Sequence, residues 1–432
     1  MAIEYSEIMA ATAMFFDTRV LDTAAESEES LIEWIGKAAV KARSNKIKYG
    51  SNDTQFTNYM AQNVGSLPDA AKVAVLKNAL QGISGAKAIK QWLNSEHGEP
   101  RDVKAKNLYM TGNTWPRTVN KFRINAFGFD DYNASDFIVH TGDKNFYGAS
   151  LKKKPKPNAA DPTLINKAFD TVLNGKQFDD IKKDITRIRS EYFAGLVRQA
   201  HEDKVIILPD SELALNDKDL FEAKGRDTSI YERAYINTRG SVQHGLNNEN
   251  APNAMIKTVN ADLAKPNNIL YKLLIKHMQN EGELFANTLI NLVLKVNLYD
   301  ELAANKKLKE YNFGFGLITG VGTVTKIKNT DPAEYNTTLS PGKWIELHTI
   351  LCGLRQLTAN KQPYVIAVDY DKKENSNAAK VFFKLSKAGV PILNMELRYK
   401  GTFTAQPQFF ATITPEFKQI LVDECLVSAP PP

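Results

Sequence analysis

Cysteine is nearly absent from this chain: Cys352 and Cys425 are the only two among 432 residues, and no CxxC spacing occurs. Two cysteines are too few for a disulfide framework, and a structural zinc site needs clustered thiolates or histidines. We therefore expect a reducing compartment, the cytoplasm, and we expect any bound metal to be held by oxygen ligands.

Long apolar runs are also missing. No stretch of eighteen apolar residues occurs, and the N-terminus "MAIEYSEIMAATAMFF" carries acidic residues where a signal peptide would carry lysine or arginine. We expect a soluble, unprocessed protein without a membrane partner.

Several catalytic motifs are absent as well. The sequence contains no GxxxxGK[ST], no GxGxxG after a strand and no GxSxG, and its six histidines show neither HExxH nor HxH spacing. These absences argue against P-loop, dinucleotide-binding, serine-hydrolase and zinc-enzyme chemistry. The glycine-rich stretch "FGFGLITGVGTV" at 313–324 fits strands and turns better than a phosphate cradle.

The composition that remains is that of a globular protein. Hydrophobic residues make up 43% and charged residues 24%, and the length suffices for two or three domains, each with its own core. The 55 Lys and Arg against 49 Asp and Glu give a net charge of +6, which fits a polyanionic partner but is also common in proteins without one.

The apolar spacing predicts a mixed α/β chain in four consecutive parts: a helical part at 1–106, a core at 107–209, a loop and helical block at 210–330, and an α/β part at 331–432. The expected helices lie at 3–16, 28–43, 68–82, 85–94, 161–173 and 178–203, as a buried pair within 267–305, and at 341–358 and 375–388. Alternating apolar residues predict a three-strand meander at 121–129, 135–139 and 145–153, and further strands at 204–209, 364–371, 392–401 and 408–415.

The stretch "SDFIVHTGDKNFYGASLKKKPKP", residues 135–157, has the pattern of a hairpin with chemistry at its open end. Side chains alternate along a strand, so Gly148, Ser150 and Lys152 share one face. If the two strands pair across "TGDKN", Asp136 comes within reach of Ser150 and Lys152. A carboxylate can hold Mg²⁺, which stabilises a phosphate and activates water, and a lysine can orient that water or neutralise the phosphate.

At these residues the chain resembles the PD-(D/E)xK superfamily of restriction-endonuclease-like nucleases. The resemblance covers about residues 107–209 and implies a core of helix, β-meander, helix and strand. Asp136 matches the metal-binding aspartate and Lys152 the lysine, whereas Ser150 stands where the family usually has Glu or Asp. The resemblance implies Mg²⁺-dependent endonucleolytic cleavage of DNA, with Mn²⁺ as a substitute metal.

The Ser150 position leaves the metal shell one carboxylate short. The Ser150 backbone or a glutamate recruited from a neighbouring helix would complete it, and Glu191, Glu7 and Glu33 are the candidates.

Basic residues follow the hairpin and could contact backbone phosphates, although a solvated amphipathic helix would carry the same residues. The ones expected to bind nucleic acid are Lys153, Lys154, Lys156 and Arg187.

A second constellation lies near the C-terminus. It is either a second copy of the nuclease pattern, with arginine in place of the lysine, or a set of cross-strand ion pairs. The ion pairs are the favoured interpretation. Its residues are Asp369, Asp371, Glu396, Arg398 and Lys400.

Three interpretations of the hairpin therefore stay open: a nuclease site, an inert ribbon, and a nucleic-acid-binding hairpin without catalysis. The alternative function is a non-catalytic structural or assembly protein, for example of a virus particle, in which case the host cytoplasm is the expected location. In the nuclease interpretation, the helical block and the C-terminal part would grip DNA, recognise a target or form the interface of a homo-oligomer.

Overall fold

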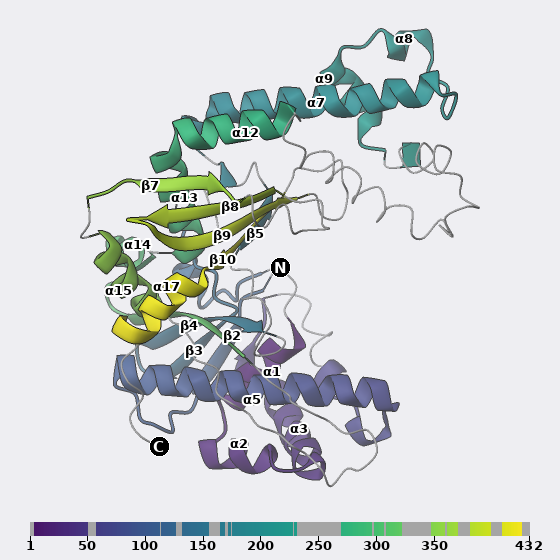
Figure 1. Ribbon diagram of the computed structural model, residues 1–432. Helices are drawn as coiled ribbons and strands as arrows, with labels where there is room; N and C mark the ends of the chain where they lie inside the picture. The colour runs from purple at the N-terminus through teal and green to yellow at the C-terminus, as the bar shows by residue number, and fades with distance from the viewer. Residues whose placement is uncertain are drawn as a thin grey trace. The chain divides into compact units, whose positions relative to one another are not determined.

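The computed structural model forms a mixed α/β fold with two sheets (Figure 1). It describes residues 4–50, 58–112, 114–126, 132–154, 165–168, 172–173, 175–227, 229–230, 269–295, 298–305, 308–321, 347–358, 361–369, 381–398 and 408–425. No helix within these ranges is long and apolar enough to cross a membrane.

The chain divides into two units, and each combines segments that are distant in sequence. The first unit comprises Met1–Pro162, Leu294–Arg355 and Ile420–Pro432, and the second comprises Thr163–Val293 and Gln356–Gln419. These units do not coincide with the four consecutive parts expected from the sequence. The chain leaves the first unit after Pro162, forms most of the second unit, and enters the first unit again at Leu294.

The sheet of the first unit has the strand order β1-β2-β3-β4-β6. β2, β3 and β4 form an antiparallel meander, β1 pairs parallel with β2, and β6 pairs parallel with β4. Its strands are β1 (Ile47–Lys48), β2 (Asn107–Met110), β3 (Phe137–Gly142), β4 (Asn145–Lys154) and β6 (Asn312–Val321).

Helices cover one face of this sheet. They are α1 (Tyr5–Ala13), α2 (Thr18–Ala24), α3 (Glu28–Ala42) and α5 (Asp69–His97). α1 packs along α5 and contacts β2 and β3. The approach of α1 to α5 requires Gly82, since a Cβ there would lie 2.7 Å from the backbone nitrogen of Ala10. The close packing buries Ile8, Met9 and Ala10 completely and fixes α1 against the sheet.

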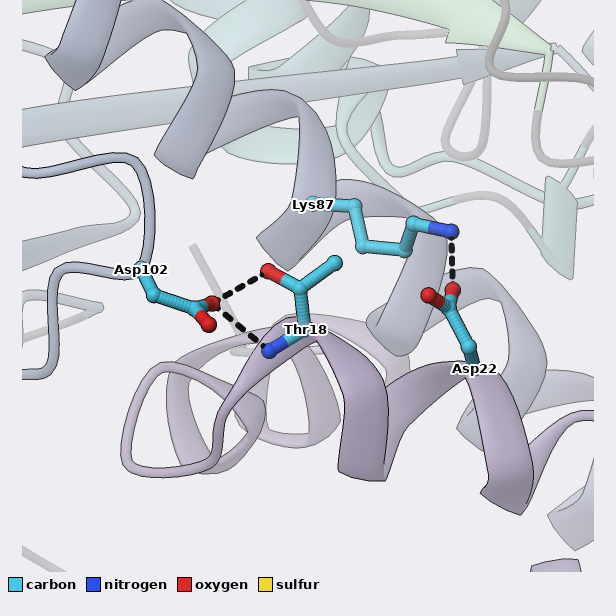
Figure 2. A network of polar contacts seen from close by, with 4 residues as sticks. All are labelled: Thr18, Asp22, Lys87 and Asp102. Carbon is cyan, nitrogen blue, oxygen red and sulfur yellow. Dashed lines mark hydrogen bonds and ion pairs between the residues drawn. The ribbon is translucent and has the colours of Figure 1, made fainter. Parts of the chain in front are cut away.

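A polar network holds α2 in place (Figure 2). The Asp102 carboxylate accepts hydrogen bonds from the Thr18 backbone N–H at 2.8 Å and from Thr18 Oγ1 at 2.6 Å. The Thr18 N–H belongs to the first turn of α2, where backbone donors lack partners within the helix. These bonds hold the pKa of Asp102 below its usual value. Lys87 of α5 adds an ion pair to Asp22 at 2.5 Å, so both ends of α2 are tied down.

Glycines in β6 admit the end of α5. A Cβ at Gly314 would lie 2.6 Å from the His97 ring, and one at Gly316 would lie 3.1 Å from the Trp92 ring. The strand interpretation of this glycine-rich stretch is confirmed over Asn312–Val321.

The second unit contains a sheet with the order β5-β10-β9-β8-β7, in which all neighbours are antiparallel. Its strands are β5 (Ile165–Ala168), β7 (Tyr364–Val368), β8 (Val381–Lys387), β9 (Val390–Arg398) and β10 (Gln408–Ile413). The longer helices of this unit are α7 (Asp179–Glu202), α12 (Ile269–Asn280) and α13 (Gly282–Leu294).

Shorter helical elements complete the described chain. The α-helices are α8 (Asp210–Leu213), α9 (Asp217–Leu220), α14 (Leu298–Ala304), α15 (Leu347–Thr358) and α17 (Pro415–Ile420). The tighter or wider turns are η1 (Val64–Ser66), η2 (Asn120–Phe122), η3 (Lys176–Phe178), η4 (Phe221–Gly225) and η5 (Leu421–Cys425).

Many predicted elements are confirmed, within a few residues at their ends. They are α1, α3, α7, α12, α13, α15, β3, β4, β7, β9 and β10. The block at 267–305, predicted as a helical pair, contains α14 as a third helix. The two helices predicted at 68–82 and 85–94 are one continuous helix, α5.

Four predicted elements are wrong. The helix predicted at 161–173 contains β5, which pairs with β10, and the helix predicted at 375–388 contains β8, whose side chains alternate between buried and half-buried. Short apolar segments fit helical and strand spacing equally well, and hydrogen bonding to neighbouring strands makes both of these segments strands. The meander begins at β2 and not at the predicted strand 121–129. Residues 204–209 form no strand, even though their side chains alternate as in one, with Ile207 89% exposed between two buried neighbours.

Candidate functional site

Asp136 lies immediately before β3, with its backbone fixed on two sides. Its N–H donates to the Ala149 carbonyl of β4 at 2.8 Å, and its own carbonyl accepts the Thr111 N–H at 3.1 Å. The carboxylate oxygen Oδ2 accepts the Leu151 N–H at 2.6 Å. The side chain is half-buried and is aimed at β4.

β4 brings Ser150 and Lys152 to this carboxylate. Phe137 pairs with Ala149, so Asp136 lies beside Ser150. Burial raises the pKa of Asp136, while the Lys152 charge, the Leu151 N–H and the nearby Ser150 hydroxyl act against that rise. Asp136, Ser150 and Lys152 therefore form one neighbourhood, as the alternation of the sequence predicts.

The Ser150 hydroxyl is fully buried, at 0% exposure. Although it comes close enough to affect Asp136, it finds no partner with hydrogen-bond geometry in the described part of the chain. The hydroxyl therefore lies beside the Asp136 carboxylate and has hydrogen-bonding capacity left for a water.

Glu7 of α1 joins the same neighbourhood. Burial raises its pKa to about 8, the negative charge of Asp136 adds to the rise, and Lys152 opposes it. Its Oε2 accepts the Glu4 N–H at 2.9 Å, a bond at the N-terminus of its own helix that orients the carboxylate. The negative charge of Asp136 thus disfavours ionisation of Glu7, and a cation close to both carboxylates would stabilise their charged forms.

These residues fit Mg²⁺ by their donor chemistry. Mg²⁺ prefers oxygen ligands, is often held by one or two carboxylates, and keeps several waters. Glu7 and Asp136 supply two carboxylates, both half-buried and so reachable from solvent, and the Ser150 hydroxyl is available. Within the described ranges, no cluster of three or more His, Cys, Asp or Glu side chains could hold a metal. Waters and main-chain oxygens would therefore fill the remaining positions.

The other two candidate glutamates have partners on their own helices. Glu33 pairs with Lys37 on α3 at 2.7 Å, and its side chain is exposed. Glu191 lies on α7 in the second unit and pairs with Arg187 at 2.6 Å. Glu7 is the candidate that the structure brings to Asp136.

The predicted phosphate-binding residues are dispersed between the two units. Lys153 and Lys154 are the last residues of β4, and Lys156 lies outside the described residues. Arg187 approaches Asp184 at 3.9 Å in addition to Glu191. Such pairs along one helix are typical of a solvated face.

The C-terminal constellation consists of ion pairs where the structure describes it. Arg398 Nε lies 2.7 Å from Glu396 on β9, and Lys384 of β8 lies 3.9 Å from Asp369. Asp371 and Lys400 lie outside the described residues. This arrangement favours the structural interpretation.

The sequence analysis missed the residues that hold Asp136 in position. The Asn133 side-chain oxygen accepts the Ser135 N–H at 3.2 Å, which is the pattern of an Asx turn. The signal is present in "NASD", because an asparagine side chain often hydrogen-bonds the backbone N–H two residues further along the chain.

Comparisons of the chain with protein-family models, with curated proteins and with solved structures find no match. Function is therefore inferred from the chain's own residues.

Proposed function

We propose that this chain is a metal-dependent nuclease that cleaves DNA phosphodiester bonds endonucleolytically, with Mg²⁺ as its metal and Mn²⁺ as a substitute. The observation that carries the proposal is the convergence of Glu7, Asp136, Ser150 and Lys152 at one end of the β3–β4 hairpin. α1 supplies the carboxylate that position 150 lacks.

The topology of the first unit supports the same proposal. A helix, α5, precedes the β2–β3–β4 meander, and β6 returns to pair parallel with β4 along its whole length. This order resembles the PD-(D/E)xK core, with the final strand supplied by Asn312–Val321. Most of the second unit would then be an insertion between β4 and β6.

Each residue has a role that its position allows. Glu7 and Asp136 would hold Mg²⁺, which supplies charge stabilisation of the phosphate and a lower pKa for the attacking water. Lys152 would orient that water or neutralise a phosphate oxygen. The Leu151 N–H keeps the Asp136 carboxylate oriented toward β4, and the Ser150 hydroxyl can hydrogen-bond a water at the metal.

Incubation of the purified protein with supercoiled plasmid and linear duplex tests the proposal. We expect nicking or linearisation with Mg²⁺ or Mn²⁺ and none with a chelator. Glu7→Gln should abolish cleavage, whereas Glu33→Gln, at an exposed residue of α3, should cleave as the wild type does. A wild-type protein that leaves DNA and RNA intact with both metals would contradict the proposal and favour the assembly-protein alternative.

A further inference from the structure

We propose that Ser135 and Gly148 interlock to position the Asp136 carboxylate, so that both are positioning residues of the candidate site. This inference rests on the proposed nuclease function and deepens it. Ser135 directly precedes Asp136, and Gly148 shares a face of β4 with Ser150 and Lys152.

Gly148 leaves the space that Ser135 occupies. A Cβ at Gly148 would fall on Ser135 Oγ, well inside van der Waals contact, and would lie 3.2 Å from Ser135 Cβ. It would also lie 3.1 Å from Phe313 Cζ of β6. Gly148 does not have a positive φ, so glycine is required here for space and not for backbone conformation.

Ser135 cannot easily move away, because buried polar groups hold it. Its hydroxyl donates to Asn133 Oδ1 at 2.6 Å, and its N–H donates to the same oxygen at 3.2 Å. Asn133 Nδ2 donates to the Phe122 carbonyl at 3.0 Å, and Thr111 Oγ1 donates to the Ser135 carbonyl. Asn133 is 1% exposed and Ser135 5% exposed, so breaking these bonds would leave buried groups unsatisfied.

The interlock therefore sets the distance from Asp136 to the rest of the site. Ser135 is wedged between Asn133 and the bare backbone of Gly148, and a shift of Ser135 would move Asp136 relative to Ser150 and Lys152. Residues that orient metal ligands typically change metal affinity by about 10- to 100-fold when they are altered.

Mn²⁺ binding measured by calorimetry on the full chain tests the inference without relying on cleavage. Gly148→Ala should weaken Mn²⁺ binding by at least about tenfold. Gly142→Ala is the matched control, because it lies on the same hairpin and a Cβ there would meet nothing within 4 Å. The double variant Ser135→Ala/Gly148→Ala removes the clashing hydroxyl and should bind Mn²⁺ more tightly than Gly148→Ala, with an affinity near that of Ser135→Ala alone. In plasmid cleavage, Gly148→Ala should lower kcat while KM for DNA stays near the wild-type value.

The outcomes separate this inference from the proposed function. A folded Gly148→Ala that binds Mn²⁺ as tightly as the wild type overturns the interlock alone, as does a double variant no better than Gly148→Ala. A wild-type protein that neither binds Mn²⁺ nor cleaves DNA overturns the proposed function and the interlock with it. If thermal melting shows that Gly148→Ala does not fold, Ser135→Ala alone decides. This variant adds no atom, so unchanged Mn²⁺ affinity in it overturns the interlock.

Discussion

Lys90 is a buried lysine on α5 whose replacement should stabilise the protein. Its side chain is 2% exposed, and its ammonium donates to the Val103 carbonyl. Burial lowers its pKa from 10.5 to about 8, although the charges of Asp102 and Asp17 act in the opposite direction. Lys104 adds a small further lowering of the pKa.

The sign of the effect follows from the two protonation states. Between pH 8 and 10.5 the unfolded chain holds a proton at Lys90 that the folded chain has released, so stability rises with pH through this window. At about 1.4 kcal/mol per pH unit, the difference between 10.5 and about 8 amounts to roughly 3 kcal/mol of destabilisation at pH 7. Lys90→Met removes this cost but loses a hydrogen bond worth about 1 kcal/mol. A net gain of roughly 2 kcal/mol at neutral pH is expected.

Urea denaturation at several pH values from about 7 to 10, followed by tryptophan fluorescence, measures this gain. The advantage of Lys90→Met should shrink as the pH rises above 8 and should be gone at about pH 10, where the remaining cost of the buried charge no longer exceeds that of the lost hydrogen bond. Taking the difference between wild type and Lys90→Met cancels the pH dependence of stability that other groups cause in both proteins, such as Tyr59, whose pKa burial raises to about 12. Lys77→Met, at an exposed position of the same helix, is the control. A Lys90→Met difference that stays constant over this range would refute the reasoning.

Four further predictions concern the candidate site. Asp136→Asn should reduce cleavage by orders of magnitude, while circular dichroism and DNA binding stay unchanged; equal cleavage would exclude Asp136 as a metal ligand. Ser150→Glu should lower the melting temperature in chelator, because it buries a third carboxylate, and should show a larger Mn²⁺-induced rise than the wild type; no such rise would argue against a metal there. The pKa of Glu7 is raised to about 8, mainly by burial and further by the charge of Asp136, so Mn²⁺ must displace a proton from it below that pH. Mn²⁺ binding should therefore tighten from about pH 6 to about pH 8, and calorimetry in buffers of different ionisation enthalpy should detect the released protons. Replacing Lys153, Lys154 and Lys156 together with alanine should weaken DNA binding for every sequence and flatten its salt dependence; an unchanged slope would mean that they are only solvated.

The hairpin could be predicted because the residues that determine it, two alternating strands and a short turn, are close together in the sequence. Alternation along β4 places Ser150 and Lys152 on one face, and a short turn returns the chain to Asp136. Glu7 could be named only as one of three candidates. Its approach depends on the packing of α1 against α5 at Gly82 and against β3, which no local pattern encodes.

Long-range pairing explains the errors in the fold. The predicted last strand of the core was the nearest apolar segment after α7, whereas β4 pairs with β6, which follows most of the second unit. β5 and β8 were mistaken for helices because their short apolar patterns are ambiguous, and their partners β10 and β9 lie elsewhere in the chain.

Hydrogen bonds and a nearby lysine hold the two carboxyl groups of the site in place, but they do not bring either pKa down to its usual value. The Glu4 N–H and the start of α1 stabilise the charge of Glu7, and the Leu151 N–H and Lys152 stabilise that of Asp136. Both pKa values nevertheless remain raised, so burial and, at Glu7, the charge of Asp136 outweigh these contacts. A divalent cation between the two carboxylates would remove the repulsion between them and offset part of their desolvation. Folding of α1 onto the sheet and metal binding should therefore favour each other, because both place Glu7 beside Asp136.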